Sequence, residues 1–180
     1  MGRSMKPINR VLVASLLSHT GVQGQRILLA LYLIDLGAQP LTVGVLAGTF
    51  SVCHALMAMQ VGKLIDRSGA RIPIMVGLLI AAAGMCLPYF VHSMPAIFGA
   101  ALMGSIAVSI TNVSTQNLVG LLSTPEDRTR NFANYSLANS LASFIGPVIA
   151  GFSIDHIGYA PACLLVALIF LAPLPVVALG

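Results

Sequence analysis

Long apolar segments separated by short polar breaks dominate the sequence. Six segments reach roughly 20 residues, the length an α-helix needs to cross a bilayer. They run at 10–34, 41–61, 72–91, 95–122, 131–154 and 162–180. These segments are about twice as long as a membrane-barrel strand and lack its period-2 alternation. The pattern therefore predicts an all-α polytopic membrane protein with six transmembrane helices, forming one domain over residues 1–180.

Composition supports the membrane assignment. The chain is 57% hydrophobic and 8% charged, whereas soluble domains average about 45–50% and about 25%. Three cysteines, Cys53, Cys86 and Cys163, each fall inside an apolar segment, where they are expected to act as small buried hydrophobes. No cysteine or histidine spacing suggests a metal site.

Other function classes find no support in the sequence. It contains no paired carboxylates within a span, no hydrolase motif and no phosphate-binding loop. We therefore expect neither an enzyme nor a cofactor. The net charge of +4 is spread over separate breaks rather than gathered on one face, so nucleic acid is not an expected partner.

The basic residues predict an orientation. Eight of the nine precede the first span or lie in the second and fourth breaks: Arg3, Lys6, Arg10, Lys63, Arg67, Arg71, Arg128 and Arg130. The first, third and fifth breaks contain no lysine or arginine. By the positive-inside rule, both termini of this chain should face the cytoplasm across the plasma (inner) membrane.

The break at 62–71, with the sequence GKLIDRSGAR, carries the most specific motif. Gly62 is followed by Asp66 and Arg67, and then by Gly69 and Arg71. With an apolar span on each side, this spacing resembles the signature loop between helices two and three of the major facilitator superfamily of transporters.

This resemblance implies the N-terminal six-helix half of a twelve-helix fold. It also implies that Asp66 takes part in a cytoplasmic latch that favours one transport state. Ala70 departs from the pattern, since the family often has a basic residue there. A solvated turn that only sets the topology is the alternative interpretation.

The fifth span carries a second family-like motif. Gly146, Pro147 and Gly151 resemble the G-P-x-x-G-G motif of proton-coupled exporters, although Ala150 replaces one glycine. Small residues also recur every fourth position, which allows close helix packing. The motif therefore supports either an exporter or tight packing alone.

Polar side chains inside the spans are candidates for substrate or proton binding. Arg26 is a costly intramembrane charge, and His19 and Gln23 share its predicted helical stripe. We expect Arg26 to contact an anionic or polar group of a substrate, with a structural contact to a neighbouring helix as the alternative. Further candidates for the same path, or for helix packing, are His54, Asn112, Gln116 and Asn139.

Together, these features predict a secondary active transporter of a small solute that works by alternating access. The fifth-span motif favours proton-coupled efflux, by antiport, and Arg26 favours organic-anion uptake instead. Because the chain matches one half of the family's fold and stops within its sixth span, it should transport only with a second six-helix half or a second copy of itself. A non-transporting truncated product or structural membrane subunit is the competing hypothesis.

Overall fold

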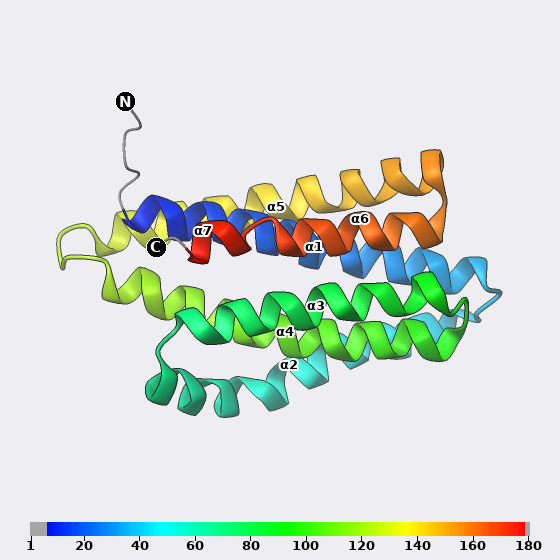
Figure 1. Cartoon of the computed structure of the whole chain (residues 1–180), viewed down its shortest axis with the longest axis horizontal. Coiled ribbons are helices and arrows are strands. Elements are labelled where there is room, and N and C mark those ends of the chain that lie inside the picture. Colours follow the sequence, from blue (N-terminus) through cyan, green and yellow to red (C-terminus); the bar gives the residue numbers. More distant parts are fainter. Residues whose placement is uncertain (1–6, 179–180) are drawn as a thin grey trace.

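The computed structural model describes residues 7–178, except for the side chains of residues 7, 58, 59, 64 and 66–68. Helices run back and forth along one axis in an antiparallel bundle (Figure 1). They are α1 (Pro7–Asp35), α2 (Pro40–Ser68), α3 (Arg71–Phe90), α4 (Met94–Leu121), α5 (Arg128–Ile157), α6 (Tyr159–Leu171) and α7 (Leu174–Ala178). The start of α1 and the short α7 lie at the same end of the bundle (Figure 1).

The all-α membrane fold is confirmed. Five helical stretches of the described chain are long and apolar enough to cross a membrane, namely α2 over Pro40–Met57, α3, α4, α5 and the joined stretch Tyr159–Ala178. The 29-residue α1 is not among them, because its middle carries His19, Gln23, Gln25 and Arg26. It nevertheless lies within the bundle and packs against α4, α5 and α6.

The predicted polar break at 62–71 is much shorter in the structure. Helix α2 continues to Ser68, so only Gly69 and Ala70 separate it from α3. Gly69 adopts φ of +72°, and its N–H donates to the Ile65 carbonyl at 2.9 Å. A positive φ is readily available to glycine. Gly62 and Asp66 are therefore helical positions in the last turns of α2, where polar residues do not interrupt the backbone hydrogen bonds.

The sixth predicted span is divided in two. Helix α6 ends at Leu171, two turn residues follow, and α7 begins at Leu174. The break coincides with Pro173, which has no backbone N–H to continue the hydrogen-bond ladder of α6. The other predicted spans agree with their helices to within three residues, the fifth helix being longer at both ends (128–157 against 131–154).

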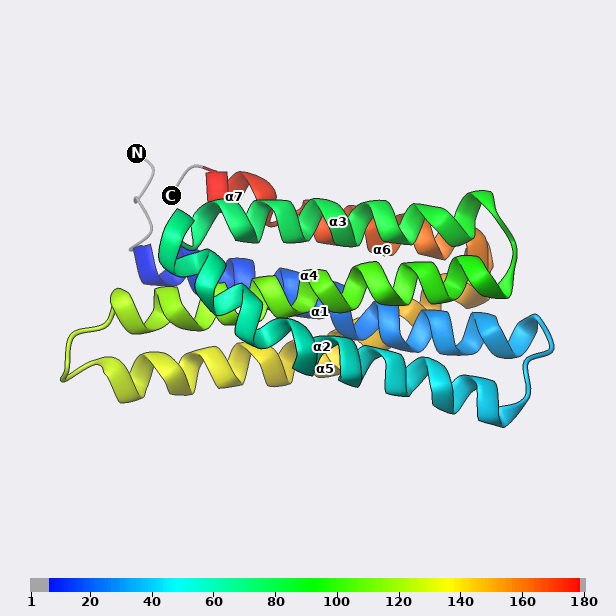
Figure 2. The ribbon, with the colours of Figure 1, turned by 90° about the horizontal axis from the view of Figure 1, so that it is seen from below.

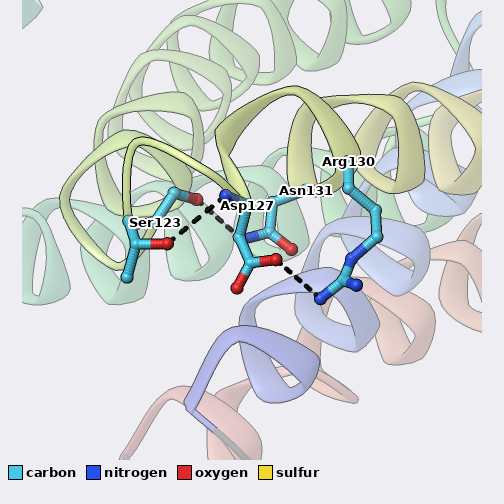
Figure 3. Close-up of polar contacts among 5 residues, drawn as sticks. Ser123, Asp127, Arg130 and Asn131 are labelled. Carbon is cyan, nitrogen blue, oxygen red and sulfur yellow. Dashed lines mark hydrogen bonds and ion pairs between the residues drawn. The ribbon is translucent and has the colours of Figure 1, made fainter.

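The turn between α4 and α5 is held by side-chain contacts (Figure 3). The Asn131 amide donates to the Ser123 hydroxyl at 2.8 Å, and the Arg130 guanidinium pairs with Asp127 at 2.9 Å. The ion pair is solvent-exposed, so its contribution to stability is small. The hydrogen bond between Asn131 and Ser123 spans the turn directly and helps to position the start of α5.

Helices α1 and α5 cross at a pair of glycines. The space that a Cβ at Gly146 would fill already holds the Thr20 carbonyl oxygen, 2.7 Å away, and the Gly24 nitrogen, 2.8 Å away. Backbone atoms cannot move aside as a flexible side chain can. The helix-five motif therefore serves close packing at position 146, whatever further role it has. A Cβ at Gly151, in contrast, would meet nothing within 4 Å.

This contrast gives a matched pair of variants. We expect Gly146→Ala to lower the free energy of unfolding by about 1–3 kcal/mol, the usual cost of overpacking. Gly151→Ala should leave it unchanged or raise it slightly, since alanine favours helix over glycine. Thermal unfolding in detergent, followed by circular dichroism, measures both. Equal stability of the two variants would contradict the glycine crossing.

Candidate functional site

Helix α4 presents two polar side chains that bind histidines on other helices. The Ser109 hydroxyl of α4 lies 2.9 Å from Nδ1 of His54 on α2. Three residues further along α4, the Asn112 side chain lies beside His19 of α1. Residues three apart on a helix share a face. Both histidines are thereby brought to the same side of α4.

The Ser109 hydroxyl is fully buried and has a second neighbour, the Ser105 carbonyl oxygen at 3.0 Å. A hydroxyl carries one proton and can also accept. If it donates to the Ser105 carbonyl, it accepts a hydrogen bond from Nδ1–H of His54. If it donates to Nδ1, His54 carries its proton on Nε2. The hydroxyl can thus serve either tautomer of His54.

Arg26 of α1 lies next to this pair of contacts. Its guanidinium carbon is 5.6 Å from the ring centroid of Phe50, one turn before His54 on α2. A cation this close to an aromatic face is attracted by the ring quadrupole. Arg26 is exposed and interacts electrostatically with His19. Within the described part of the chain, no carboxylate lies within ion-pair distance of Arg26.

Three helices thus converge on one polar surface, which we call the α1–α2–α4 face. Its members are His19 and Arg26 of α1, Phe50 and His54 of α2, and Ser109 and Asn112 of α4. A bundle of this kind can present an uncompensated cation, two imidazoles and an amide to a solute. It lacks the three or more His, Cys, Asp or Glu side chains that a metal site needs, as far as the described residues go.

Two other predicted candidates lie elsewhere. The Gln23 amide donates to the Ser143 hydroxyl of α5 at 2.8 Å, and the Asn139 oxygen accepts from the Ser15 hydroxyl at 3.1 Å. Both contacts join α1 to α5. The predicted common stripe of His19, Gln23 and Arg26 is therefore divided, because α1 is flanked by α4 on one side and α5 on the other. Gln116 is exposed on α4, one turn beyond Asn112.

The residues of the 62–71 motif are not part of the α1–α2–α4 face. The side chains of Asp66 and Arg67 lie outside the described residues. Arg71, the first residue of α3, donates from Nε to the Val177 carbonyl at 2.9 Å and from Nη2 to the Ala178 carbonyl. It therefore caps the end of α7, a contact that could not be predicted from the sequence.

Sequence reasoning also missed Gln25. This side chain is 1% exposed, and its amide nitrogen donates to the Ala100 carbonyl of α4 at 2.9 Å. Its oxygen has no hydrogen-bond partner within the described chain. The amide occupies the space above Gly104, where a Cβ would lie 2.1 Å from Nε2. The packing of Gln25 against Gly104 could be inferred only by pairing a glutamine on one helix with a glycine on another. The two residues are 79 positions apart in sequence.

Comparisons with known proteins agree with this architecture. The family model of the Major Facilitator Superfamily matches residues 11–179. The chain is 23% identical over 124 residues to the quinolone resistance protein NorA of Staphylococcus aureus, covering 69% of this chain and 32% of NorA. It is 29% identical over 120 residues to the multidrug resistance protein Stp of Mycobacterium tuberculosis, covering 64% of this chain and 22% of Stp. The chain thus spans about a third or less of the length of these relatives.

Solved structures share the fold. The human organic anion transporter MFSD10 superposes with a TM-score of 0.89 at 16% identity, covering 98% of this chain and 42% of that one. A POT family transporter in complex with 5-aminolevulinic acid superposes with a TM-score of 0.86 at 17% identity. The match covers 96% of this chain and 37% of that one. At such identities the likeness establishes the fold alone. The six-helix arrangement is therefore one part of a larger architecture in both of these structures.

Proposed function

Because the chain belongs to the Major Facilitator Superfamily, we propose that it forms one wall of a secondary transporter for a small organic solute. Transporters of this fold bind substrate near the bilayer midplane, between two halves, and rock one half against the other. The α1–α2–α4 face is the wall we assign to the solute. The relatives named for quinolone and multidrug resistance make efflux from the cytoplasm the favoured direction.

The observation that carries this proposal is the environment of Arg26. A guanidinium inside a membrane bundle is costly unless it faces water, a partner or a ligand. Here it lies over Phe50 and beside His19, and the described chain gives it no carboxylate. An anionic or zwitterionic solute would neutralise it by binding the exposed side of the guanidinium, since Phe50 beneath it is buried. The fold shared with an organic anion transporter is compatible with this substrate class.

Proton coupling is a further part of the proposal. His19 and His54 are the imidazoles beside the α4 polar residues, and an imidazole nitrogen can bind or release a proton. Solute release and proton uptake on the same face would produce antiport. The helix-five motif, which resembles that of proton-coupled exporters, supports the same coupling. The latch role of Asp66 at the end of α2 remains a proposal from the motif.

A second six-helix unit completes the path in this account. The two solved structures extend well beyond the matched region. One half alone cannot expose a binding site to the two sides of the membrane in turn, because that motion needs a second half to rock against. The unit is either a further part of the same polypeptide, a separate chain or a second copy. We place the ends of this chain on the cytoplasmic side of the plasma membrane, following the distribution of its basic residues.

The role of Arg26 is tested with a charged probe and its neutral analogue. We expect benzoate, but not benzamide, to raise the melting temperature of the purified chain. Arg26→Gln should weaken the apparent benzoate affinity by roughly ten- to a hundredfold, since a hydrogen bond to a charged group contributes about 1.5–3 kcal/mol. Arg128→Gln, a charge change at the exposed start of α5, is the control. Undiminished benzoate binding by a folded Arg26→Gln protein would refute the assignment.

The need for a second unit is tested by reconstitution. Vesicles that contain only the purified 180-residue chain at a density of one monomer each should show no quinolone transport above the background of empty vesicles. Transport should appear only when the density permits dimers or when a second six-helix unit is added. Robust transport by a proven monomer, measured by quinolone fluorescence, would show that one half suffices.

A further inference from the structure

A cavity of about 210 Å³ lies at the end of the bundle opposite the α1–α2 turn. Its lining comes from the first turns of α1 and α3, the last turns of α4, and α7. These segments lie together at the left end of both ribbon views (Figures 1 and 2). The cavity is separate from the α1–α2–α4 face, since none of the residues of that face line it.

The lining is apolar over most of its surface and cationic at two points. Leu78 of α3 and Leu118 of α4 are among the aliphatic walls, and Ser18 and Thr115 supply hydroxyls. The Ser18 hydroxyl already donates to the Ala14 carbonyl of its own helix at 2.7 Å. The cations are Arg10, in the first turn of α1, and Arg71, at the start of α3.

Arg71 retains donors for an anion. Its two hydrogen bonds to the α7 carbonyls use one N–H of Nε and one of Nη2. A guanidinium has five N–H donors, so three have no partner among the described residues. Within the described chain, no carboxylate lies within ion-pair distance of Arg71. The α7 contacts also hold this guanidinium in the lining of the cavity, where its remaining N–H groups could donate to a phosphate oxygen.

We propose that this cavity binds an anionic phospholipid, with part of an acyl chain against the aliphatic walls and the phosphate on Arg10 and Arg71. The cavity is many times larger than the ~10–15 Å³ that a single water needs on the same measure of volume. Water fills an apolar cavity poorly, because it finds too few polar partners there. Acyl chains are the apolar molecules that a membrane supplies. Arg10 lies in the first turn of α1 and Arg71 begins α3, so in this proposal both lie near the lipid headgroups.

The two parts of the lining select one class of ligand. Inorganic phosphate would be attracted to the arginines but would leave the aliphatic walls empty. A zwitterionic lipid would fill the walls, but its own ammonium would offset the phosphate charge. An anionic lipid meets both requirements, as do other basic pockets between helices at the cytoplasmic side of membranes. This inference does not depend on transport, because it concerns a different part of the bundle.

The test uses the purified full chain and native mass spectrometry at increasing collision energy. The probes are phosphatidylglycerol, phosphatidylethanolamine of the same acyl length, and inorganic phosphate. We expect the chain to retain one phosphatidylglycerol under conditions that remove the other two. Arg10→Gln and Arg71→Gln should each weaken that retention by roughly tenfold, since each removes a charge-assisted contact to the phosphate. Arg128→Gln, at the same end of the bundle but outside the cavity, should leave it unchanged.

Filling the cavity tests the acyl part separately. Ala14 lines the cavity, so Ala14→Leu should displace the lipid while both arginines remain. Val176→Phe, which fills the same space from α7, serves if Ala14→Leu does not fold. Equal retention of the two lipids, equal loss in Arg128→Gln, or unchanged binding in a folded cavity-filling variant would each overturn the proposal. Retention of inorganic phosphate as strong as that of phosphatidylglycerol would do so as well.

Discussion

The structure depends on how α1 is accommodated inside a bundle that lies in lipid. This helix carries an arginine, a histidine and two glutamines through its middle, and polar groups in hydrocarbon are costly unless they are partnered. Its neighbours provide most of those partners. Gln23 donates to α5, the Gln25 nitrogen donates to α4, and His19 lies beside Asn112 of α4, while the Gln25 oxygen has no partner within the described residues. The remaining cation, Arg26, lies over an aromatic ring of α2. The position of α1 therefore determines where α2, α4 and α5 can lie.

Small residues make this arrangement possible. Gly146 lets the backbone of α5 approach α1 at Gly24, and Gly104 leaves room in α4 for the Gln25 amide. Helices in membranes gain little from hydrophobic association with one another, so close van der Waals contact and hydrogen bonds hold them together. The outward faces of α2, α3 and α5 meanwhile expose large apolar side chains, including Leu56, Leu79 and Phe144. These faces suit lipid, whereas the α1–α2–α4 face does not.

Much of this fold was predictable from the sequence, because its main signal is the length and hydrophobicity of each span. The order and the approximate bounds of most helices follow from that signal alone. The end of α2 was not predicted, since Lys63, Asp66 and Arg67 look like a loop although a helix protruding from a bilayer tolerates such residues. The division of the sixth span at Pro173 was also missed, because the surrounding residues are uniformly apolar.

The candidate site was predictable in part. An intramembrane arginine is conspicuous in any sequence, and Asn112 and His54 stand out for the same reason. Which of these side chains meet could not be predicted, because helical periodicity gives the face of a residue within its own helix but not the neighbour on that face. Gln23 illustrates the point, since it shares the heptad-like spacing of His19 and Arg26 yet contacts α5. Phe50 was missed because a phenylalanine in an apolar span carries no distinguishing signal.

The most direct test of the central claim is whether the α1–α2–α4 face meets water rather than lipid. Single cysteines are placed at Arg26 and at Leu79, an outward-facing position on α3 that is 51% exposed, after Cys53, Cys86 and Cys163 are replaced by alanine. A water-soluble maleimide then probes both in membrane vesicles. The account predicts rapid labelling at position 26 and none at position 79. Equal protection of the two positions would contradict it, because Arg26 would then lie in hydrocarbon and could not line a path for a solute.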